Sequence, residues 1–350
     1  MSILLQPLTT AFRLGVAIRA ASYRHGWLKT RRLSRPVVSV GNLTVGGTGK
    51  TPLVAYIAET LLRRGRLPGI LTRGYGRRGR DDLIAIEPRA CRNPDPREIG
   101  DEPALLARAL PEVPVVVCAD RYRGGRMLEE RFGVDVHLVD DGFQHWALAR
   151  NVDIVTLDLT QKLSNTALLP AGRQREPCSA LARAHVIVLT RKELGHQPAF
   201  ESLENQVRRF NSPAKIFLST TVLCGLRNAH SSGIEPPRGF RGPESRPVAA
   251  FCGIGNASAF FADLRQWGFG VAGERSYRDH HVYSPRDLEF LQQLAVRCGA
   301  SALVTTEKDA LNLPRAGEGV PIFACVIRPE LNEAEAFEEA LFARLSSQTE

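Results

Sequence analysis

The sequence predicts an α/β fold in which a mainly parallel sheet carries helices on both faces and is followed by a second, smaller α/β domain. Three observations lead to this prediction. Short apolar runs alternate with segments of helical spacing through the first half of the chain, as in a sheet covered on both sides. A glycine-rich turn joins the first apolar run to the first helical segment. A stretch rich in glycine, proline, serine and arginine, residues 231–246, then interrupts the alternation.

The expected strands are short runs rich in valine, leucine and isoleucine. In the first domain they cover residues 36–40, 68–71, 83–86, 113–118, 134–139, 152–157 and 185–189. Helical spacing marks residues 51–64, 102–110 and 121–132. In the second domain the expected strands are 247–251, 302–305 and 320–325, and the expected helices are 257–267, 285–296 and 333–345.

These elements divide the chain into four parts. Residues 1–35 form a basic amphipathic segment, and residues 36–212 form the larger α/β domain. Residues 213–246 are a hinge or linker region, and residues 247–350 form the smaller α/β domain, which we expect to close over the active site.

The N-terminal segment is strongly basic. The chain has a formal net charge of +9, and residues 1–35 contain seven arginine and lysine residues and no acidic one. Leu5, Leu8, Phe12 and Val16 form one stripe of an expected helix, with Arg13 on the opposite side. The apolar stretch is too short to span a bilayer, and a signal-peptide cleavage site is missing. The segment fits either an interfacial helix facing anionic headgroups or a terminal helix packed on the protein's own surface.

Composition excludes several classes of protein. Hydrophobic residues make up 43% of the chain and charged residues 24%, as in a globular protein without low-complexity tracts. The seven cysteines form no CxxC pair and no Cys/His cluster. This argues against a disulfide framework or a zinc site and favours a reducing compartment.

The strongest motif is GGTGKT at residues 46–51, placed between an expected strand and an expected helix. Glycines let backbone N–H groups turn toward phosphate oxygens, and the helix N-terminus adds its positive dipole. The motif therefore predicts a P-loop that binds ATP and Mg²⁺, although Thr44 stands at the first glycine position of the full pattern. Val45 stands where the deviant P-loop class has an extra lysine. The predicted nucleotide-binding residues are Val45, Gly46, Gly47, Thr48, Gly49, Lys50, Thr51 and Pro52.

A second nucleotide element is the apolar run 134–139, which ends in Asp140-Asp141. Carboxylates at the end of a buried strand lie beside the phosphate loop, because ligands gather at that edge of an open α/β sheet. We expect one of the two, directly or through water, to hold the metal ion. The complete set of predicted metal ligands is Thr51, Glu102, Asp140 and Asp141.

Two further clusters are candidates for acid–base chemistry. Asp101 and Glu102 stand at the start of an expected helix, where an N-cap with a first-turn acid is the preferred interpretation of these residues alone. The alternative makes Asp101 the base for an attacking hydroxyl and Glu102 an ancillary metal ligand. Asp279-His280-His281 suggests a metal site, but adjacent histidines point apart on a strand. His280 is therefore interpreted as an acid–base or orienting group.

Other polar residues at the same sheet edge are candidates for substrate contact. Arg73 and Tyr75 follow the second strand, and a cation with an aromatic ring on a turn can contact phosphate or sugar. An ordinary exposed loop explains them as well. The predicted substrate-binding residues are Asn42, Arg73, Tyr75, Gln144 and His145.

Taken together, these motifs resemble those of the tetraacyldisaccharide 4′-kinases, the lipid A 4′-kinases of Gram-negative bacteria. The resemblance covers most of the chain up to about Pro314. It rests on motifs in the same order: Gly41-Asn42-Leu43-Thr44 before the GGTGKT loop, Arg73-Gly74-Tyr75-Gly76, Gly100-Asp101-Glu102-Pro103, Asp140-Asp141-Gly142-Phe143-Gln144-His145, Leu169-Pro170-Ala171-Gly172, Asp279-His280 and Thr306-Glu307-Lys308-Asp309-Ala310.

The resemblance implies two α/β domains joined by a hinge and ATP-dependent phosphorylation of the 4′-hydroxyl of a tetraacylated glucosamine disaccharide 1-phosphate. It also implies peripheral or monotopic attachment to the anionic lipid surface at the cytoplasmic face of the inner membrane. The residues themselves show no signature of a nucleic-acid-binding fold, and no obligate protein partner is inferred. At the matching positions, Asp101 resembles the catalytic base, partnered by His280. Lys50 and Thr51 belong to the phosphate loop, and Glu102, Asp140 and Asp141 organise the metal and phosphates.

Two other functions fit parts of the pattern. One is a nucleotide-switch ATPase or GTPase of the deviant P-loop class, which the missing lysine at Val45 argues against. The other is a non-catalytic nucleotide-binding adaptor held at the membrane by the basic segment, which leaves Asp101 and His280 without a role.

Overall fold

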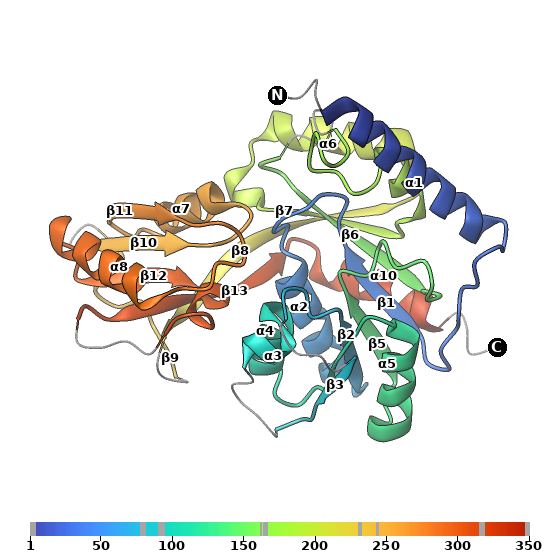
Figure 1. Ribbon diagram of the computed structural model, residues 1–350, viewed down its shortest axis with the longest axis horizontal. Helices are drawn as coiled ribbons and strands as arrows, with labels where there is room; N and C mark the ends of the chain where they lie inside the picture. The colour runs from blue at the N-terminus through green and yellow to red at the C-terminus, as the bar shows by residue number, and fades with distance from the viewer. Residues whose placement is uncertain are drawn as a thin grey trace.

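The computed structural model describes residues 5–77, 82–89, 95–161, 163, 167–229, 233–242, 245–314 and 319–346. Within them, strands form one sheet in the order β11-β10-β12-β13-β8-β7-β6-β1-β5-β2-β4-β3, and β9 pairs with β8. Figure 1 shows two lobes, a larger one around β1 and a smaller one around β10, joined by β8 and β13. Most neighbouring strands are parallel, so the predicted α/β fold is confirmed.

The larger lobe is built on seven strands whose order brings β1 to the middle of the lobe. They are β1 (Val37–Gly41), β2 (Pro68–Thr72), β3 (Leu83–Ile86), β4 (Val115–Cys118), β5 (Val136–Asp140), β6 (Val152–Asp158) and β7 (Val186–Thr190). All except the edge strand β3 are buried at every residue. Burial on both faces explains why the sequence shows unbroken apolar runs here.

Helices cover both faces of these strands because alternate side chains point to opposite sides. Val38 and Ile70 pack with one group of helices, α2 (Lys50–Arg63), α3 (Pro96–Ile99) and α4 (Asp101–Ala109). Val37 and Leu71 pack on the other face, toward α5 (Arg121–Met127) and the π-helical turn Leu128–Phe132 that continues it. The same face carries α6 (Gln197–Phe210) and a 3₁₀ turn, Cys178–Arg183.

The smaller lobe repeats this arrangement on fewer strands. Its sheet consists of β10 (Val248–Cys252), β11 (Val271–Ser276) and β12 (Ala302–Thr306). Val248 and Ala250 pack against α7 (Ala257–Gln266), whereas Ala249 and Phe251 pack against α8 (Pro285–Arg297). A single turn of helix, α9 (Glu307–Ala310), follows β12 directly and lies against α4 of the larger lobe.

Two long antiparallel strands connect the lobes. β8 (Lys215–Asn228) pairs with β7 at its start and with β13 (Ile322–Leu331) over the rest of its length, and β9 (Ile234–Glu235) adds a short edge. The expected hinge region 213–246 therefore contains a 14-residue strand, whose pairing with β13 shifts register once, between Gly225 and Leu223.

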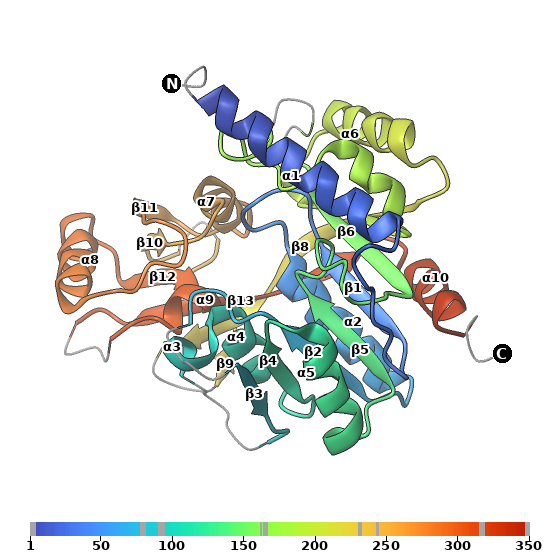
Figure 2. The same cartoon turned by 45° about the vertical axis from the view of Figure 1, so that its right-hand side comes forward.

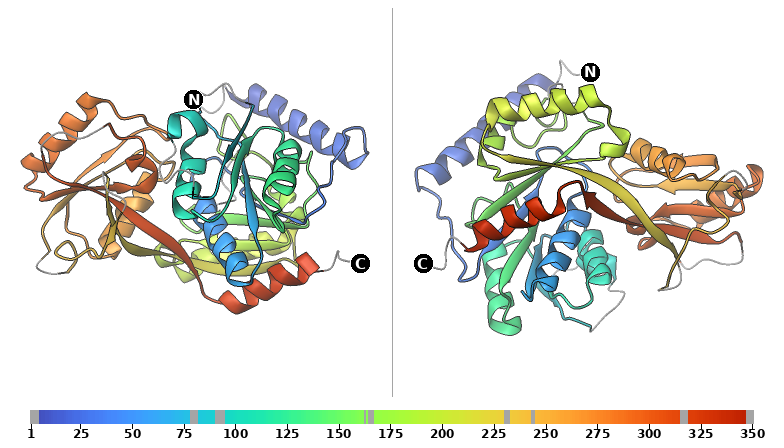
Figure 3. Two further views of the ribbon diagram at one scale, coloured as in Figure 1. Left: turned by 90° about the horizontal axis from the view of Figure 1, so that it is seen from below. Right: turned by 180° about the vertical axis from the view of Figure 1, so that it is seen from behind.

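The C-terminal helix departs from the expected division of the chain. Residues 247–350 were expected to form the smaller domain, but α10 (Ala334–Ser346) packs in the larger lobe, beside α2 (Figure 3). Phe337 and Leu341 are fully buried in the same cluster as Val38 and Ile57. The physical reason is the length of β13, which carries the chain back across the lobe boundary to an apolar surface that α10 can cover.

The N-terminal helix α1 (Gln6–Arg24) lies along the outside of the larger lobe, near α6 (Figure 2). It has no fully buried residue and touches the lobe through Thr9, which accepts a bond from the Ala171 N–H, and Tyr23, which stacks on Trp146. The predicted stripe is divided: Phe12 and Val16 are half-buried, whereas Leu8 is 58% exposed. Leu14 and Ile18 are also exposed. None of the described helices combines the length and hydropathy that crossing a membrane requires.

Candidate active site

The phosphate loop lies between β1 and α2, as the sequence predicts. Gly46 and Gly49 have φ angles of 109° and 78°, which side-chain-bearing residues rarely adopt. No side chain caps the N-terminus of α2, so its first backbone N–H groups are left to bind an anion. Lys50 and Thr51 begin the helix, where a phosphate-binding lysine and a metal-binding hydroxyl are needed.

A buried network underneath fixes the shape of this loop. The Asn42 amide donates to Thr48 Oγ1 at 3.0 Å, and Thr48 Oγ1 lies 2.7 Å from Thr156 Oγ1 on β6. Gln144 donates to the Asn42 carbonyl at 2.9 Å. Asn42 is fully buried among these partners. Asn42, which is predicted to contact substrate, therefore has a buried position that supports the loop from below.

Asp141 links the phosphate loop to two cations. Arg175 donates to both of its carboxylate oxygens, at 2.6 and 3.0 Å, and Lys50 Nζ lies 3.5 Å from Oδ1. Partial burial opposes ionisation, but the charges of Lys50 and Arg175 outweigh it and lower the pKa of Asp141 to about 2. Asp141 is thus a permanent anion that orients the P-loop lysine.

Asp140 is the other member of the pair and has a different environment. Burial, with the nearby carboxylates Glu102 and Asp141, raises the pKa of Asp140 to about 7. Its Oδ1 is buried without a hydrogen-bond partner. A carboxylate in this condition is stabilised as an anion when a cation binds to it.

These residues fit a magnesium ion. Within the described part of the chain, no three acidic, histidine or cysteine side chains converge as a complete metal cage. Mg²⁺ does not need one, because it usually keeps several waters and binds one or two carboxylates together with substrate phosphates. The unpaired oxygen of Asp140 beside the phosphate loop matches that mode of binding.

Asp101 and His280 meet across the boundary between the lobes. Asp101 is the first residue of α4, and its Oδ2 lies 2.9 Å from Nδ1 of His280, which follows β11 in the smaller lobe. Asn312 donates to the other carboxylate oxygen at 2.9 Å. Burial raises the pKa of Asp101, but the bonds from His280 and Asn312 and the charge of Lys308 outweigh it and lower it overall.

Lys308 completes this cluster from the start of α9. Its Nζ lies 3.3 Å from Nε2 of His280, 3.1 Å from Asp279 and 3.6 Å from Glu102. An ammonium can only donate, so the Nε2 atom that faces it accepts and the proton of a neutral ring lies on Nδ1. The bond to Asp101, opposed by burial and Lys308, raises the pKa of His280. The imidazole is therefore oriented to donate to Asp101.

The remaining predicted residues border this cluster. The Tyr75 side chain is 66% exposed, and its ring centroid lies 5.5 Å from that of His280. Burial, reinforced by Arg121 and Arg150, lowers the pKa of His145 to about 4. Arg73 lies close enough to Arg121 for their charges to repel. The charge of Arg121 also acts on the nearby carboxylates Asp140 and Asp141.

Several residues at the site were missed by the sequence analysis. Arg121 is 3% exposed, its Nε is buried without a partner, and burial with the charge of Arg73 lowers its pKa to about 10. Arg173 donates to the carbonyls of Val45 and Gly255, on either side of the lobe boundary. Arg173 and Arg175 directly follow the Leu169–Gly172 motif, and Lys308 lies inside the 306–310 motif. A cation in or close after a recognised motif is the signal that could have found Arg173, Arg175 and Lys308, whereas Arg121 lies near no such motif.

Comparisons with known proteins show which proteins this chain resembles. The sequence profile of the family described as tetraacyldisaccharide-1-P 4′-kinase matches residues 1–346. A tetraacyldisaccharide 4′-kinase of Geobacter metallireducens is 36% identical over 341 residues, which is 97% of this chain and 96% of the relative. The protein of the same name in Koribacter versatilis is 40% identical over 344 residues, or 95% and 96% of the two chains.

A solved structure matches over nearly the same extent. The crystal structure of the apo form of LpxK from Aquifex aeolicus in complex with ATP superimposes with a TM-score of 0.77. The two sequences are 31% identical, and the match covers 98% of this chain and 99% of the other.

Proposed function

The chain belongs to the tetraacyldisaccharide-1-P 4′-kinase family, and we infer that it transfers the γ-phosphoryl group of ATP to the 4′-hydroxyl of a tetraacylated glucosamine disaccharide 1-phosphate. This reaction belongs to lipid A biosynthesis. The observation that carries the assignment to this site is the pairing of Asp101 with His280 beside a phosphate loop. A carboxylate held by a histidine can accept a proton from a sugar hydroxyl.

The roles we propose for individual residues follow from their surroundings. The backbone N–H groups of residues 46–50 and the Lys50 ammonium bind the phosphates and offset charge on the transferring group. Asp101 accepts the hydroxyl proton through a carboxylate oxygen, while His280 and Asn312 hold that carboxylate in position. Asp141 and Arg175 orient Lys50 and the loop. Catalysis of phosphoryl transfer is mostly positioning and electrostatics, which this arrangement supplies.

Mg²⁺ is the expected companion of ATP in this family. We propose that Asp140, with Thr51 and Glu102, holds it, and that Asp141 contributes mainly through Lys50. A bound Mg²⁺ supplies charge neutralisation across the phosphate oxygens. These carboxylates would hold the ion near the end of β5, where Asp140 lies close enough to Glu102 and Asp141 for their charges to act on it.

We also propose that α1 attaches the protein to an anionic membrane surface, at the cytoplasmic face of the inner membrane. The support is the exposed apolar side chains Leu8, Leu14 and Ile18 of α1, together with Trp27 beyond the end of the helix, which is 75% exposed. Residues 1–35 carry seven cationic and no acidic residues, and three of the cations, Arg13, Arg19 and Arg24, lie on α1. Apolar insertion and attraction to anionic headgroups act together on such a helix.

Transfer of labelled phosphate tests the function directly. Purified protein, γ-labelled ATP and Mg²⁺ are incubated with the tetraacyl disaccharide 1-phosphate, with the same acceptor already phosphorylated at the 4′-position as the control. Labelling of the first acceptor only, with the product position mapped, supports the assignment. ATP hydrolysis that proceeds equally with and without acceptor contradicts it and favours the nucleotide-switch alternative.

A further inference from the structure

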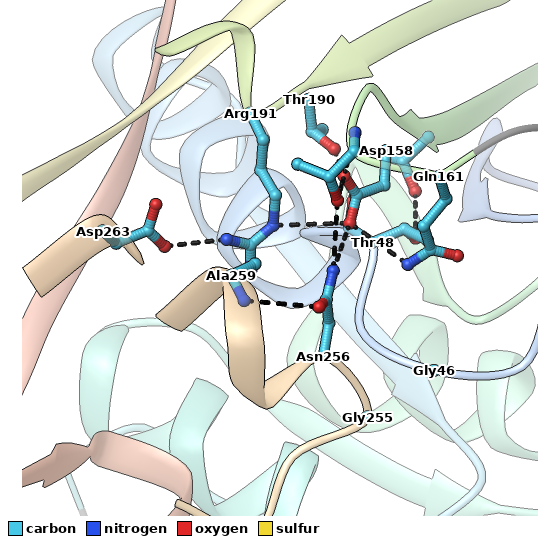
Figure 4. Close-up of polar contacts among 12 residues, drawn as sticks. Gly46, Thr48, Asp158, Gln161, Thr190, Arg191, Gly255, Asn256, Ala259 and Asp263 are labelled. Carbon is cyan, nitrogen blue, oxygen red and sulfur yellow. Dashed lines mark hydrogen bonds and ion pairs between the residues drawn. The ribbon is translucent and has the colours of Figure 1, made fainter. Parts of the chain in front are cut away.

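A second set of polar contacts joins the lobes, and it lies on the other side of the phosphate loop from Asp101. In the sheet, β5, β2 and β4 lie on one side of β1, and β6 and β7 lie on the other. β6 and β7 end in Asp158 and Thr190, which are opposite each other in the register. Figure 4 shows that the side chains around these two strand ends meet residues of α7.

Arg191 is the central residue of this set. Its Nη1 donates to Asp263 Oδ2 on α7 at 2.7 Å, and its Nε lies 3.4 Å from Asp158 Oδ2. Both carboxylates are buried, with side chains 4% and 0% exposed, and the Arg191 side chain is 14% exposed. The guanidinium therefore bridges an acid of the smaller lobe and an acid of the larger lobe, as the dashed lines in Figure 4 show.

Asn256 reinforces the bridge from the smaller lobe. Its amide nitrogen donates to Asp158 Oδ2 at 3.0 Å, while its carbonyl oxygen accepts from the Ala259 N–H and caps α7. Next to it, a Cβ atom on Gly255 would lie 2.8 Å from the Cα of Gly46. The start of α7 thus abuts the phosphate loop so closely that a small shift of the lobe would alter the contact.

The same strand ends support the phosphate loop. Thr190, directly before Arg191, donates its hydroxyl to the Thr48 carbonyl at 3.2 Å. Arg191 itself has a φ of 60°, an uncommon conformation for a residue with a side chain. This backbone geometry places the guanidinium beside α7 while Thr190 remains bonded to the loop.

Stability alone is a weak reason for this arrangement. Taking the ions of a buried bridge out of water costs about as much as their attraction returns, so apolar residues of similar size often serve as well. The burial of Asp263 raises its pKa to about 6 even with Arg191 beside it, which shows the cost of keeping this acid here. Hydrogen-bonded ion pairs that join the two lobes therefore contribute more to the relative orientation of the lobes than to the free energy of unfolding.

We propose that Arg191 is a positioning residue for phosphoryl transfer: it docks α7 on the strand ends that hold the phosphate loop and thereby aligns the lobe that carries His280. The proposal rests on the inferred kinase function. The smaller lobe contacts the larger one on both sides of the loop, around His280 on one side and around Arg191 on the other, and Arg173 reaches Gly255 beside the loop itself. Loss of the Arg191 contact leaves α7 held to the strand ends by Asn256 and beside the loop by Arg173, so the smaller lobe is less tightly aligned and the distance between His280 and Asp101 is less fixed.

A double-mutant cycle between Arg191 and His280 tests this. Arg191→Ala is expected to lower kcat about 10- to 100-fold, the scale of an ångström's misplacement, with ATP affinity changed by less than about threefold. In the His280→Ala background the same replacement is expected to cost less than about threefold, because the group it aligns is already absent. Arg191→Lys should recover part of the loss. An equal loss in both backgrounds, or turnover of Arg191→Ala within about twofold of the unmodified protein, overturns the proposal.

Two further variants distinguish an effect of the Arg191 side chain from effects of its backbone conformation and of overall stability. Arg191→Gly fits the left-handed backbone without strain, so activity retained in this variant contradicts a role for the guanidinium. Arg265→Ala is the matched control, since Arg265 lies on the same helix and pairs with Glu274 at the surface of the smaller lobe. It is expected to leave kcat within about twofold.

Hydrogen exchange gives a readout that does not depend on the reaction. In Arg191→Ala, amides of residues 253–266 and of the phosphate loop are expected to exchange faster, whereas in Arg265→Ala those of the loop are unchanged. Unchanged exchange in both segments in Arg191→Ala overturns the docking role even if the variant is less active. If the unmodified protein fails to phosphorylate the acceptor, the proposed function fails, and the exchange result still decides whether Arg191 docks the lobe.

Discussion

The Nδ1 atom of His280 lies 2.9 Å from Oδ2 of Asp101, although the two residues are 179 positions apart in the chain. One belongs to the smaller lobe and the other starts a helix of the larger lobe. The bond joins the two lobes, so we expect the basicity of the Asp101 carboxylate to depend on how the lobes are placed relative to each other.

Asp101 and His280 are therefore expected to act as one unit. Asp101→Ala or His280→Ala should lower kcat by about 10²- to 10⁴-fold, the usual contribution of a general base, with little change in ATP affinity. The double replacement should cost scarcely more than the worse single one. Steady-state kinetics of the four proteins measure this, and losses that multiply would show that the residues work independently.

Lys50→Ala is expected to remove most transfer activity, by about 10²- to 10³-fold, because an ammonium aimed at developing charge is lost. Its melting temperature should stay close to that of the unmodified protein, since Arg175 still pairs with both oxygens of Asp141. Circular dichroism melts beside the kinase assay check both parts. Near-normal turnover in a folded variant would remove Lys50 from the phosphate site.

Arg175→Lys is expected to raise the KM for ATP several-fold while kcat falls less. A lysine cannot form the two parallel bonds to Asp141 and still reach Asn42, which the Arg175 guanidinium contacts at 2.7 Å. The matched control is Arg126→Lys, at an exposed pair with Glu130 on α5, which should leave both constants unchanged. An unchanged KM in Arg175→Lys would show that the loop keeps its shape without the bidentate pair.

The exposed apolar face of α1 gives a test of membrane attachment. Leu14→Asp with Ile18→Asp should release the protein from anionic vesicles without lowering its stability, because both side chains face outward. Deleting residues 1–20 should have the same effect on binding and should impair the use of bilayer substrate more than of a short-chain soluble analogue. Vesicle sedimentation at moderate salt is the measurement, and continued sedimentation of the double variant would place the membrane contact elsewhere.

The lowered pKa of His145 predicts that the folded protein loses stability at acid pH. Burial and neighbouring arginines lower its pKa to about 4, below the usual value near 6.5, so the folded protein binds fewer protons than the unfolded chain between these values. Its contribution is present above pH 6.5 and is lost as the pH falls toward 4. His145→Gln should reduce the loss between pH 6.5 and 4.5 by about 1 to 3 kcal/mol, as measured by urea unfolding. Parallel curves for both proteins would contradict the buried, neutral state of this ring.

Much of the fold and part of the site could be predicted from local sequence. The strands of the larger lobe are apolar runs buried at every residue, and the phosphate loop is a short glycine-rich motif. Both can therefore be predicted from short segments of sequence. Lys50 and Asp141 were predicted for the same reason, since each directly follows a recognisable element. Valine and leucine favour burial because their side chains are apolar, and glycine adopts positive φ angles because it has no Cβ atom. Both tendencies can be predicted from the residue type alone.

Only the tertiary structure decided which distant side chains meet. β8 and α6 carry mixed polar and apolar residues, and their places became clear only through pairing with β7 and packing on its sheet. α10 packs in the larger lobe because β13 returns the chain there. Asn42 is a buried support because Gln144 and Arg175 bond to it from distant parts of the chain, and Arg191 bridges the lobes because Asp263 lies far from it in sequence. The sequence by itself determined the strands, the phosphate loop and the kind of chemistry, since these depend on neighbours along the chain. The closing of one lobe on the other depends on contacts between surfaces, which no local pattern encodes.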